Sequence, residues 1–218
     1  GSLFCGIGAI EHALKRLTIK TEIQFASDID ANCKKSYFAN YEISEERWCD
    51  DVHKLNAKQY RYKVDLLVGG APCQAFSLVG KRRGFEDTRG TLFFEIMRIA
   101  RERKPRIIFL ENVKGLLNHN GGDTFETILT TLDELGYGVE WQVLNSKHFG
   151  VPQNRERVFI VGHLGGICGK SIFPIRGEKA APEILQIAEK NKKIRTFYCQ
   201  CQTMSGHVLG GAFDYLKL

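Results

Sequence analysis

The sequence predicts a doubly wound α/β domain whose sheet is mostly parallel, with an antiparallel pair of strands at one edge. Short apolar, β-branched runs at residues 64–68 and 107–110 end in glycines or a carboxylate, which is typical of buried parallel strands. Segments with helical spacing, such as residues 91–103, lie between such runs. Later in the chain, only the loop at residues 145–156 separates two strands. Because this loop is too short for a helical crossover, we expect those strands to pair antiparallel.

Composition indicates a reduced, cytoplasmic protein, and its charge suits a polyanionic partner but also matches many ordinary enzymes. The 218 residues are 43% hydrophobic and carry a net charge of +6, enough for one core and a small appendage. The seven cysteines have no repeated spacing, and neither a signal peptide nor a membrane-spanning run is present. Cys199 and Cys201 lack a second close pair of cysteines or histidines, so we predict no metal site.

The chain opens with a pattern of strand, glycine turn and helix. Leu3 and Phe4 lead into Gly6-Ile7-Gly8, and residues 9–17 have helical spacing. This order is typical of a nucleotide-binding unit, but the third glycine of the dinucleotide fingerprint is missing. A cofactor without a pyrophosphate needs no helix terminus beneath phosphates, so S-adenosylmethionine fits this turn better than NAD.

Two acidic segments follow. A second strand at residues 23–27 ends at Asp28, about twenty residues past the glycine turn, where ribose hydroxyls are commonly bound. The alternative is that Asp28 or Asp30 caps the helix at residues 31–40, and we expect Asp30 to do so. Further on, spacing alone predicts a solvated turn at Asp50 and Asp51.

The strand at residues 64–68 leads to the cysteine around which the chain is organised. Gly69 and Gly70 permit tight backbone turns, and Pro72 fixes φ immediately before Cys73. A free cysteine is commonly a small buried hydrophobe. Held in a rigid loop at a strand end, Cys73 is instead a candidate nucleophile.

The loop after Cys73, at residues 78–90, is long, polar and rich in arginine and lysine, which is typical of a functional segment. A helix at residues 91–103 follows and ends at Lys104-Pro105. The most apolar strand, residues 107–110, carries Glu111 at its carboxyl end. A glutamate there needs a partner or a function, and the alternative is that it satisfies nearby backbone amides.

The last elements before residue 163 are a helix and two strands. Asp123 to Glu126 resembles a capping box for a helix that runs to Leu135 and ends at Gly136. Strands at residues 139–144 and 157–161 form the antiparallel pair. Arg155 and Arg157 lie at their junction, and one of the two is a candidate for a plain surface charge.

Four of these segments together resemble the DNA (cytosine-5) methyltransferases of prokaryotic restriction-modification systems. The segments are residues 2–9, the Pro72-Cys73-Gln74 loop, Glu111-Asn112-Val113 and residues 153–157. They occur in the family's order and cover most of the chain up to Gly162. The resemblance implies methyl transfer from S-adenosylmethionine to carbon 5 of cytosine in double-stranded DNA, on a base flipped out of the duplex.

The resemblance also implies roles for individual residues. Cys73 is expected to form the covalent adduct, Glu111 to contact ring nitrogen 3, and Arg157 and Arg155 to bind the flipped nucleotide. Asp51 is expected to accept the adenine amino group and Val52 to pack on the ring. The implied cofactor-binding residues are Phe4, Gly6, Ile7, Gly8, Asp28, Ile29, Asp51, Val52, Pro72 and Leu92. The implied DNA-binding residues are Gln74, Ser77, Lys81, Arg82, Arg83 and Arg89.

We expect two regions: a catalytic domain at residues 1–163 and a basic segment at residues 164–218. The second carries eight Lys/Arg against four Asp/Glu, which suits either phosphate contacts or a solvated face. It has no convincing match to the family's target-recognition region or final motif, so it is expected to be a partial or truncated recognition region, and the chain is expected to be clipped at both ends or part of a larger assembly. Two alternatives therefore remain: an RNA (tRNA) cytosine-5 methyltransferase, or part of a split enzyme completed by a second polypeptide. The expected location is the bacterial cytoplasm or the nucleoid.

Overall fold

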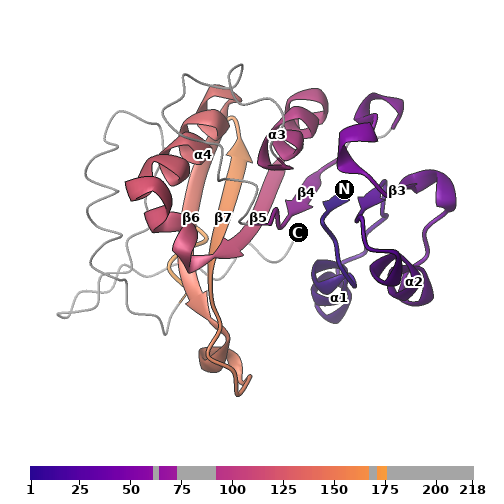
Figure 1. The fold of residues 1–218 in the computed structure, drawn as a ribbon, viewed down its shortest axis with the longest axis horizontal. Coiled ribbons are helices and arrows are strands. Elements are labelled where there is room, and N and C mark those ends of the chain that lie inside the picture. Colours follow the sequence, from indigo (N-terminus) through magenta and orange to yellow (C-terminus); the bar gives the residue numbers. More distant parts are fainter. Residues whose placement is uncertain (61–63, 73–91, 167–170, 176–218) are drawn as a thin grey trace.

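The computed structural model describes residues 1–60, 64–72, 92–166 and 171–175 (Figure 1). In this part of the chain, seven strands form one sheet in the order β3-β2-β1-β4-β5-β7-β6. The strands are β1 (Ser2–Leu3), β2 (Ala26–Ser27), β3 (Trp48–Cys49), β4 (Leu66–Gly69), β5 (Ile107–Val113), β6 (Tyr137–Asn145) and β7 (Glu156–Leu164). Neighbours from β3 to β5 pair parallel.

The antiparallel pair at one edge is confirmed. β7 pairs antiparallel with β6 and also with β5, so the reversed strand lies between two strands of the opposite direction. The hairpin loop contains a short 3-10 turn, η7 (Ser146–Phe149). Because of this pairing, the start of β7 lies beside the carboxyl ends of β5 and β6.

Helices cover both faces of the sheet, which confirms the doubly wound class. Figure 1 shows α1 (Ala9–Arg16) and α2 (Ala31–Asn40) on one side, and α3 (Leu92–Arg103) and α4 (Asp123–Glu134) on the other. Shorter 3-10 turns are η1 (Glu45–Arg47), η2 (Val52–Lys54), η3 (Ala57–Gln59) and η6 (Lys114–Gly122). None of the helices in the described ranges has the length and apolar character needed to cross a membrane.

Successive residues of β5 point alternately into the buried core beside α3 and toward the other side of the sheet, where α1 lies. Ile108, Leu110 and Asn112 are buried, whereas the alternate residues are partly exposed. Leu110 points to the α3 side, because a Cβ added at Gly69 would lie 2.9 Å from Ile96 of α3 and 3.7 Å from Leu110. Since successive side chains alternate across a strand, Phe109 and Glu111 point to the opposite face.

Glu111 does not terminate its strand as predicted. The ladder between β5 and β7 continues to the pair Val113 and Arg157, so Glu111 lies two residues before the end of β5. The apolar run stops earlier than the strand because antiparallel pairing with β7, rather than hydrophobicity, holds the last residues of β5.

Helix boundaries follow the predicted capping chemistry in one case and not in another. The Asp30 side chain accepts hydrogen bonds from the backbone of Asn32 and Cys33, as expected for the N-cap of α2. The capping box predicted at Asp123 is wrong, because Gly122 precedes the first helical residue and no side chain caps α4. A run of positive-φ residues, Asn120 to Gly122, carries the chain directly from η6 into α4. Gly136, with φ of 90°, follows the helix as predicted.

Residues 171–175 lie against the edge strand β6. Both side-chain groups of Gln142 bond the backbone of Ile175, at 2.8 Å and 3.2 Å. The carboxylate of Glu140, which is 0% exposed, accepts hydrogen bonds from His163, Ser171, and the backbone N–H groups of Ile172 and Phe173. The start of the basic C-terminal segment is thus anchored to the sheet. The predicted boundary at residues 163 and 164 remains a prediction.

Candidate active site

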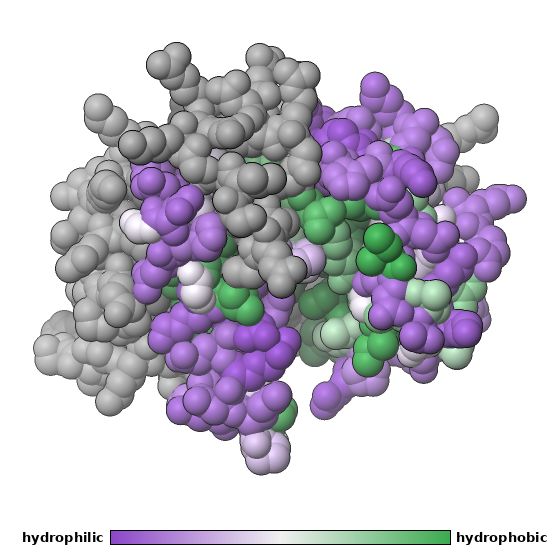
Figure 2. Space-filling model, in the orientation of Figure 1, coloured by the Kyte–Doolittle hydropathy of each residue, from purple (hydrophilic) through white to green (hydrophobic). Residues whose placement is uncertain are grey.

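A cavity of about 580 Å³ lies at the carboxyl ends of β1, β4 and β5, beside β6 and the start of β7. Its volume falls within the range of small-molecule sites. Figure 2 shows hydrophobic residues in a hollow near the centre of this view. The cavity of about 580 Å³ is lined by residues that include Leu3, Phe4, Cys5, Ile10, Glu11, Gly69, Gly70, Phe109, Glu111, Leu144, Phe149, Arg155, Arg157 and Phe159.

The glycine turn after β1 adopts backbone conformations that favour glycine. Gly6 and Gly8 have φ of 54° and 85°. A Cβ at Gly8 would lie 2.2 Å from the ring of Tyr41, whose hydroxyl donates to Gly8 O at 2.6 Å. A Cβ at Gly6 would meet nothing within 4 Å, so the backbone there is open to a ligand. The turn therefore combines a fixed conformation with an accessible backbone.

Asp28, at the end of β2, holds this turn in place. Its Oδ2 accepts from the backbone N–H of Gly6 at 2.7 Å, and its Oδ1 accepts from Asp30 at 3.0 Å. A carboxylate oxygen has a further lone pair after one such bond, so Asp28 can still accept from a ligand hydroxyl. Asp28 does not line the cavity, and its role in ribose binding stays a prediction.

The other predicted cofactor residues lie in several loops, in η2 and at the start of α3. Ile7 and Ile29 are exposed, and Asp51 caps η2 by accepting from His53 N at 3.0 Å. Val52 is buried, and Leu92 packs partly buried against the core at the start of α3. None of these belongs to the cavity lining, in contrast to Phe4. Their contacts with a cofactor stay predictions.

Glu111 and two arginines meet at the rim of the cavity. Glu111 Oε1 lies 2.9 Å from Nε of Arg157 and 3.9 Å from Nη2 of Arg155. Glu111 pairs with Phe159 across the ladder and Arg157 with Val113, so the two charged residues are diagonal neighbours on one face. Their side chains are 33% and 21% exposed, compared with 50% for Arg155. The three predicted residues are therefore brought together, with Arg157 as the tighter partner.

Asn112 links this strand to the loop that leads to Cys73. Its side-chain amide is buried and donates to Ala71 O at 2.8 Å, while its Oδ1 accepts from Val113 N at 2.9 Å. Ala71 is buried and precedes Pro72, which is exposed. The predicted residues Cys73, Gln74, Ser77, Lys81, Arg82, Arg83 and Arg89 lie outside the described residues.

The described cysteines are not activated for attack. Burial, together with the charges of Asp28 and Glu11, raises the pKa of the Cys5 thiol well above its ordinary value. Burial and neighbouring aspartates likewise raise the pKa of Cys33 and of Cys49. A thiol whose pKa is raised stays protonated at neutral pH and is a weak nucleophile. Cys5, although it lines the cavity, is therefore a poor alternative to Cys73.

Several lining residues were not singled out from the sequence. Glu11 of α1 accepts a hydrogen bond from the hydroxyl of Tyr37 at 2.8 Å, and Phe109 and Phe159 place their ring centroids 5.8 Å apart. Phe109 precedes Glu111 by two residues, so strand alternation is the signal that could have placed both on one face. Glu11 and Phe159 reach the cavity only through helix packing and strand register.

Comparison with known proteins agrees with the motifs. A family model described as C-5 cytosine-specific DNA methylase matches residues 1–207. The orphan methyltransferase M.Rho11sI of Bacillus phage rho11s is 48% identical over 161 residues, which are 74% of this chain and 32% of the phage protein. The type II methyltransferase M.HpaII of Haemophilus parainfluenzae is 48% identical over 162 residues, 73% of this chain and 44% of that enzyme. The chain thus spans less than half the length of these curated relatives.

Solved structures support the fold. A crystal structure of a Spodoptera frugiperda DNMT2 mutant superposes with a TM-score of 0.61 at 24% identity, covering 82% of this chain and 52% of that one. At this identity the likeness concerns architecture alone. The family match spans nearly the whole chain and includes the cavity, the glycine turn and the segment of Glu111. This chain therefore belongs to the C-5 cytosine-specific DNA methylase family.

Proposed function

We propose that this chain carries the catalytic machinery of an enzyme that transfers a methyl group from S-adenosylmethionine to carbon 5 of cytosine in double-stranded DNA. The observation that carries the proposal is the pair of Glu111 and Arg157 at the cavity rim, beside the strand end that leads to Cys73. The match to a family described as C-5 cytosine-specific DNA methylase supports DNA as the substrate.

Carbon 5 of cytosine is a poor nucleophile, so the residues must first disrupt the aromatic ring. The Cys73 thiolate forms a bond to carbon 6, and the displaced ring electrons make carbon 5 enamine-like. Glu111 donates a hydrogen bond or a proton at ring nitrogen 3, which offsets the negative charge that this addition creates. Arg157, with Arg155 at the more exposed position, binds the carbonyl side of the base or its phosphate. After methyl transfer, loss of the carbon-5 proton to a base lets Cys73 leave.

The residues present fit S-adenosylmethionine, which when bound supplies an electrophilic methyl group on a sulfonium. The cavity combines the apolar rings of Phe4, Phe109 and Phe159 with the carboxylates of Glu11 and Glu111. The open backbone at Gly6 permits close approach of a ligand. The residues that would hold the cofactor are Phe4, Gly6, Ile7, Gly8, Asp28, Ile29, Asp51, Val52, Pro72 and Leu92.

Double-stranded DNA is the proposed partner, contacted by Gln74, Ser77, Lys81, Arg82, Arg83 and Arg89. Basic and polar side chains of this kind bind phosphates and set the register of a protein on the duplex. The target base must leave the stack to reach Cys73. Such a substrate implies action in the bacterial cytoplasm, at the nucleoid.

The test is covalent trapping with duplex DNA that contains 5-fluorocytosine, because fluorine at carbon 5 cannot leave as a proton does. We expect a stable adduct mapped by mass spectrometry to Cys73, and none with Cys73→Ser. Cys33→Ser is the matched control and should form the adduct at the wild-type rate. An adduct at Cys5 or Cys49, or methylation of transfer RNA in place of DNA, contradicts the proposal. Assays of the purified chain with and without added polypeptides show whether a second component is required.

A further inference from the structure

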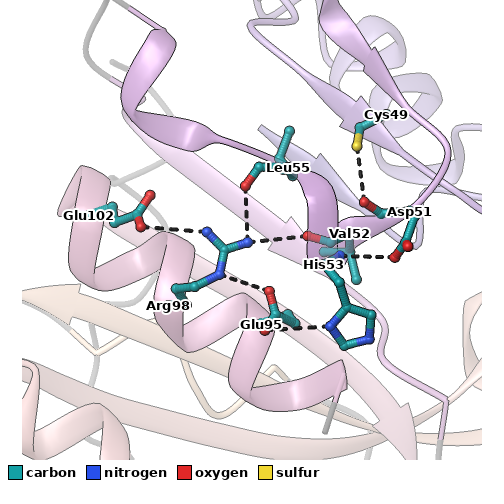
Figure 3. Close-up of polar contacts among 8 residues, drawn as sticks. All are labelled: Cys49, Asp51, Val52, His53, Leu55, Glu95, Arg98 and Glu102. Carbon is teal, nitrogen blue, oxygen red and sulfur yellow. Dashed lines mark hydrogen bonds and ion pairs between the residues drawn. The ribbon is translucent and has the colours of Figure 1, made fainter. Parts of the chain in front are cut away.

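Arg98 of α3 uses its whole guanidinium group to hold other residues (Figure 3). Nη2 donates to the backbone carbonyls of Val52 at 3.2 Å and Leu55 at 3.0 Å. Nε donates to Glu95 at 2.8 Å, and Nη1 to Glu102 at 3.5 Å. The side chain is 30% exposed, so these bonds are partly shielded from water. One residue thus connects a rigid helix to a segment more than forty positions earlier in the chain.

The two acceptor carbonyls lie at either end of the 3-10 turn η2. This turn is closed by the bonds from Lys54 N to Asp51 O and from Leu55 N to Val52 O, at 2.9 Å and 3.2 Å. Val52 O keeps a second lone pair beyond its bond within the turn, and so short a turn has little rigidity of its own. The planar fork of an arginine suits such a pair of carbonyls, and Glu95 and Glu102, one turn before and after, orient it.

Other contacts tie the same turn to α3 and to β3. His53 donates its backbone N–H to Asp51 Oδ1 at 3.0 Å, and its ring Nδ1 lies 3.5 Å from Glu95. The thiol of Cys49 donates to Asp51 O at 3.0 Å. Figure 3 shows Arg98 and Glu95 on one side of the turn and Cys49 on the other. Asp51 and Val52 are therefore positioned from both sides.

We propose that Arg98 is a positioning residue for the adenine end of the S-adenosylmethionine site. It acts through the backbone of Val52 and Leu55 and does not touch the cofactor itself. This inference rests on the proposed function, together with the roles that the family resemblance implies: Asp51 accepting the adenine amino group and Val52 packing on the ring. A binding side chain must be held to within about half an ångström, and α3 supplies the rigidity that η2 lacks.

The same helix offers a matched control. Arg103, five residues later on α3, donates from Nη1 to Tyr60 O at 3.0 Å. Arg103→Met removes a bond of the same kind, from an arginine to a backbone carbonyl, but at the residue that follows η3. Any general loss of stability from weakening the contact of α3 with this part of the chain appears in both variants. An effect confined to η2 appears in Arg98→Met alone.

The experiment measures the equilibrium affinity of the full-length protein for S-adenosylmethionine by calorimetry. Arg98→Met should weaken binding roughly 5- to 30-fold, while Arg103→Met should stay within about twofold of wild type. Arg98→Lys, whose ammonium lacks the planar fork, should lose an intermediate amount. If Arg98→Met does not fold, Arg98→Lys compared with Arg103→Lys gives the same contrast.

A double-mutant cycle with Asp51→Ala separates positioning from stability. If Arg98 acts through Asp51, Arg98→Met should weaken binding much less in the Asp51→Ala background. Independent, multiplying effects, or equal losses in the Arg98 and Arg103 variants, overturn the inference while leaving the proposed function intact. A wild-type protein that does not bind S-adenosylmethionine overturns the proposed function, and this inference with it.

Discussion

The hydrogen bond from Asn112 to Ala71 O offers a direct test of whether β5 helps to position Cys73, the proposed nucleophile. Asn112→Asp keeps the shape of the side chain and the acceptor for Val113 N, but it replaces the amide donor facing Ala71 O, 2.8 Å away, by a carboxylate oxygen. Two oxygens then face each other at a buried position. Because Ala71 precedes Cys73 by two residues, the loop has to move to relieve this repulsion.

The expected cost has two parts. A buried polar group left without its partner lowers the free energy of unfolding by about 1–3 kcal/mol. For a chain of this size, each kcal/mol lowers the melting temperature by about 2–4 °C. A displacement of a reacting group by about 1 Å can slow the chemical step by about 10²-fold. We therefore expect a modest loss of stability and a much larger loss of rate.

The assay compares thermal unfolding with the rate of adduct formation on 5-fluorocytosine DNA. Gln142→Glu is the matched control. Gln142 is also a buried amide that bonds backbone, at Ile175, but it lies on the edge strand β6, which pairs with neither β4 nor β5. This variant should lower the melting temperature similarly and leave the adduct rate within about twofold of wild type. The reasoning is refuted if Asn112→Asp melts lower but forms the adduct at the wild-type rate.

Two further predictions concern the arginines and the anchored C-terminal segment. Arg157→Met should slow single-turnover methyl transfer by about 10²-fold, and Arg155→Met by less than about tenfold. The reason is that Arg157 is the closer and more buried partner of Glu111, so equal losses would contradict the prediction. Burial alone raises the pKa of Glu140, but the hydrogen bonds from His163, Ser171, and the backbone of Ile172 and Phe173 outweigh it and lower the pKa overall. The resulting stability is present above the ordinary glutamate pKa of about 4.3 and is lost as the pH falls through the lower folded value. Glu140→Gln should therefore lower the free energy of unfolding in urea by about 1–3 kcal/mol at pH 7, and this difference from wild type should shrink below about pH 4. A difference that stays constant with pH would show that Glu140 does not stay ionised.

Much of the architecture followed from local patterns. The class of fold, the glycine turn, the N-cap at Asp30 and the antiparallel pairing of β6 with β7 were all predicted. These features depend on side-chain periodicity, backbone freedom at glycine and loop length, which neighbouring residues determine. Errors came where local signals compete: the strand of Glu111 continues past its apolar run, and α4 begins after a glycine instead of a capping side chain.

The sequence by itself determined which chemical groups are present and close to which strands they stand, including Glu111 after an apolar run and Arg157 at the start of the following hairpin strand. Tertiary structure decided which of them meet. The register between β5 and β7 makes Glu111 and Arg157 diagonal neighbours, and the packing of α3 brings Arg98 to the carbonyls of Val52 and Leu55. Such contacts join residues more than forty positions apart, so no local pattern encodes them. They arise because burying both faces of one twisted sheet leaves few ways to arrange its strands and helices.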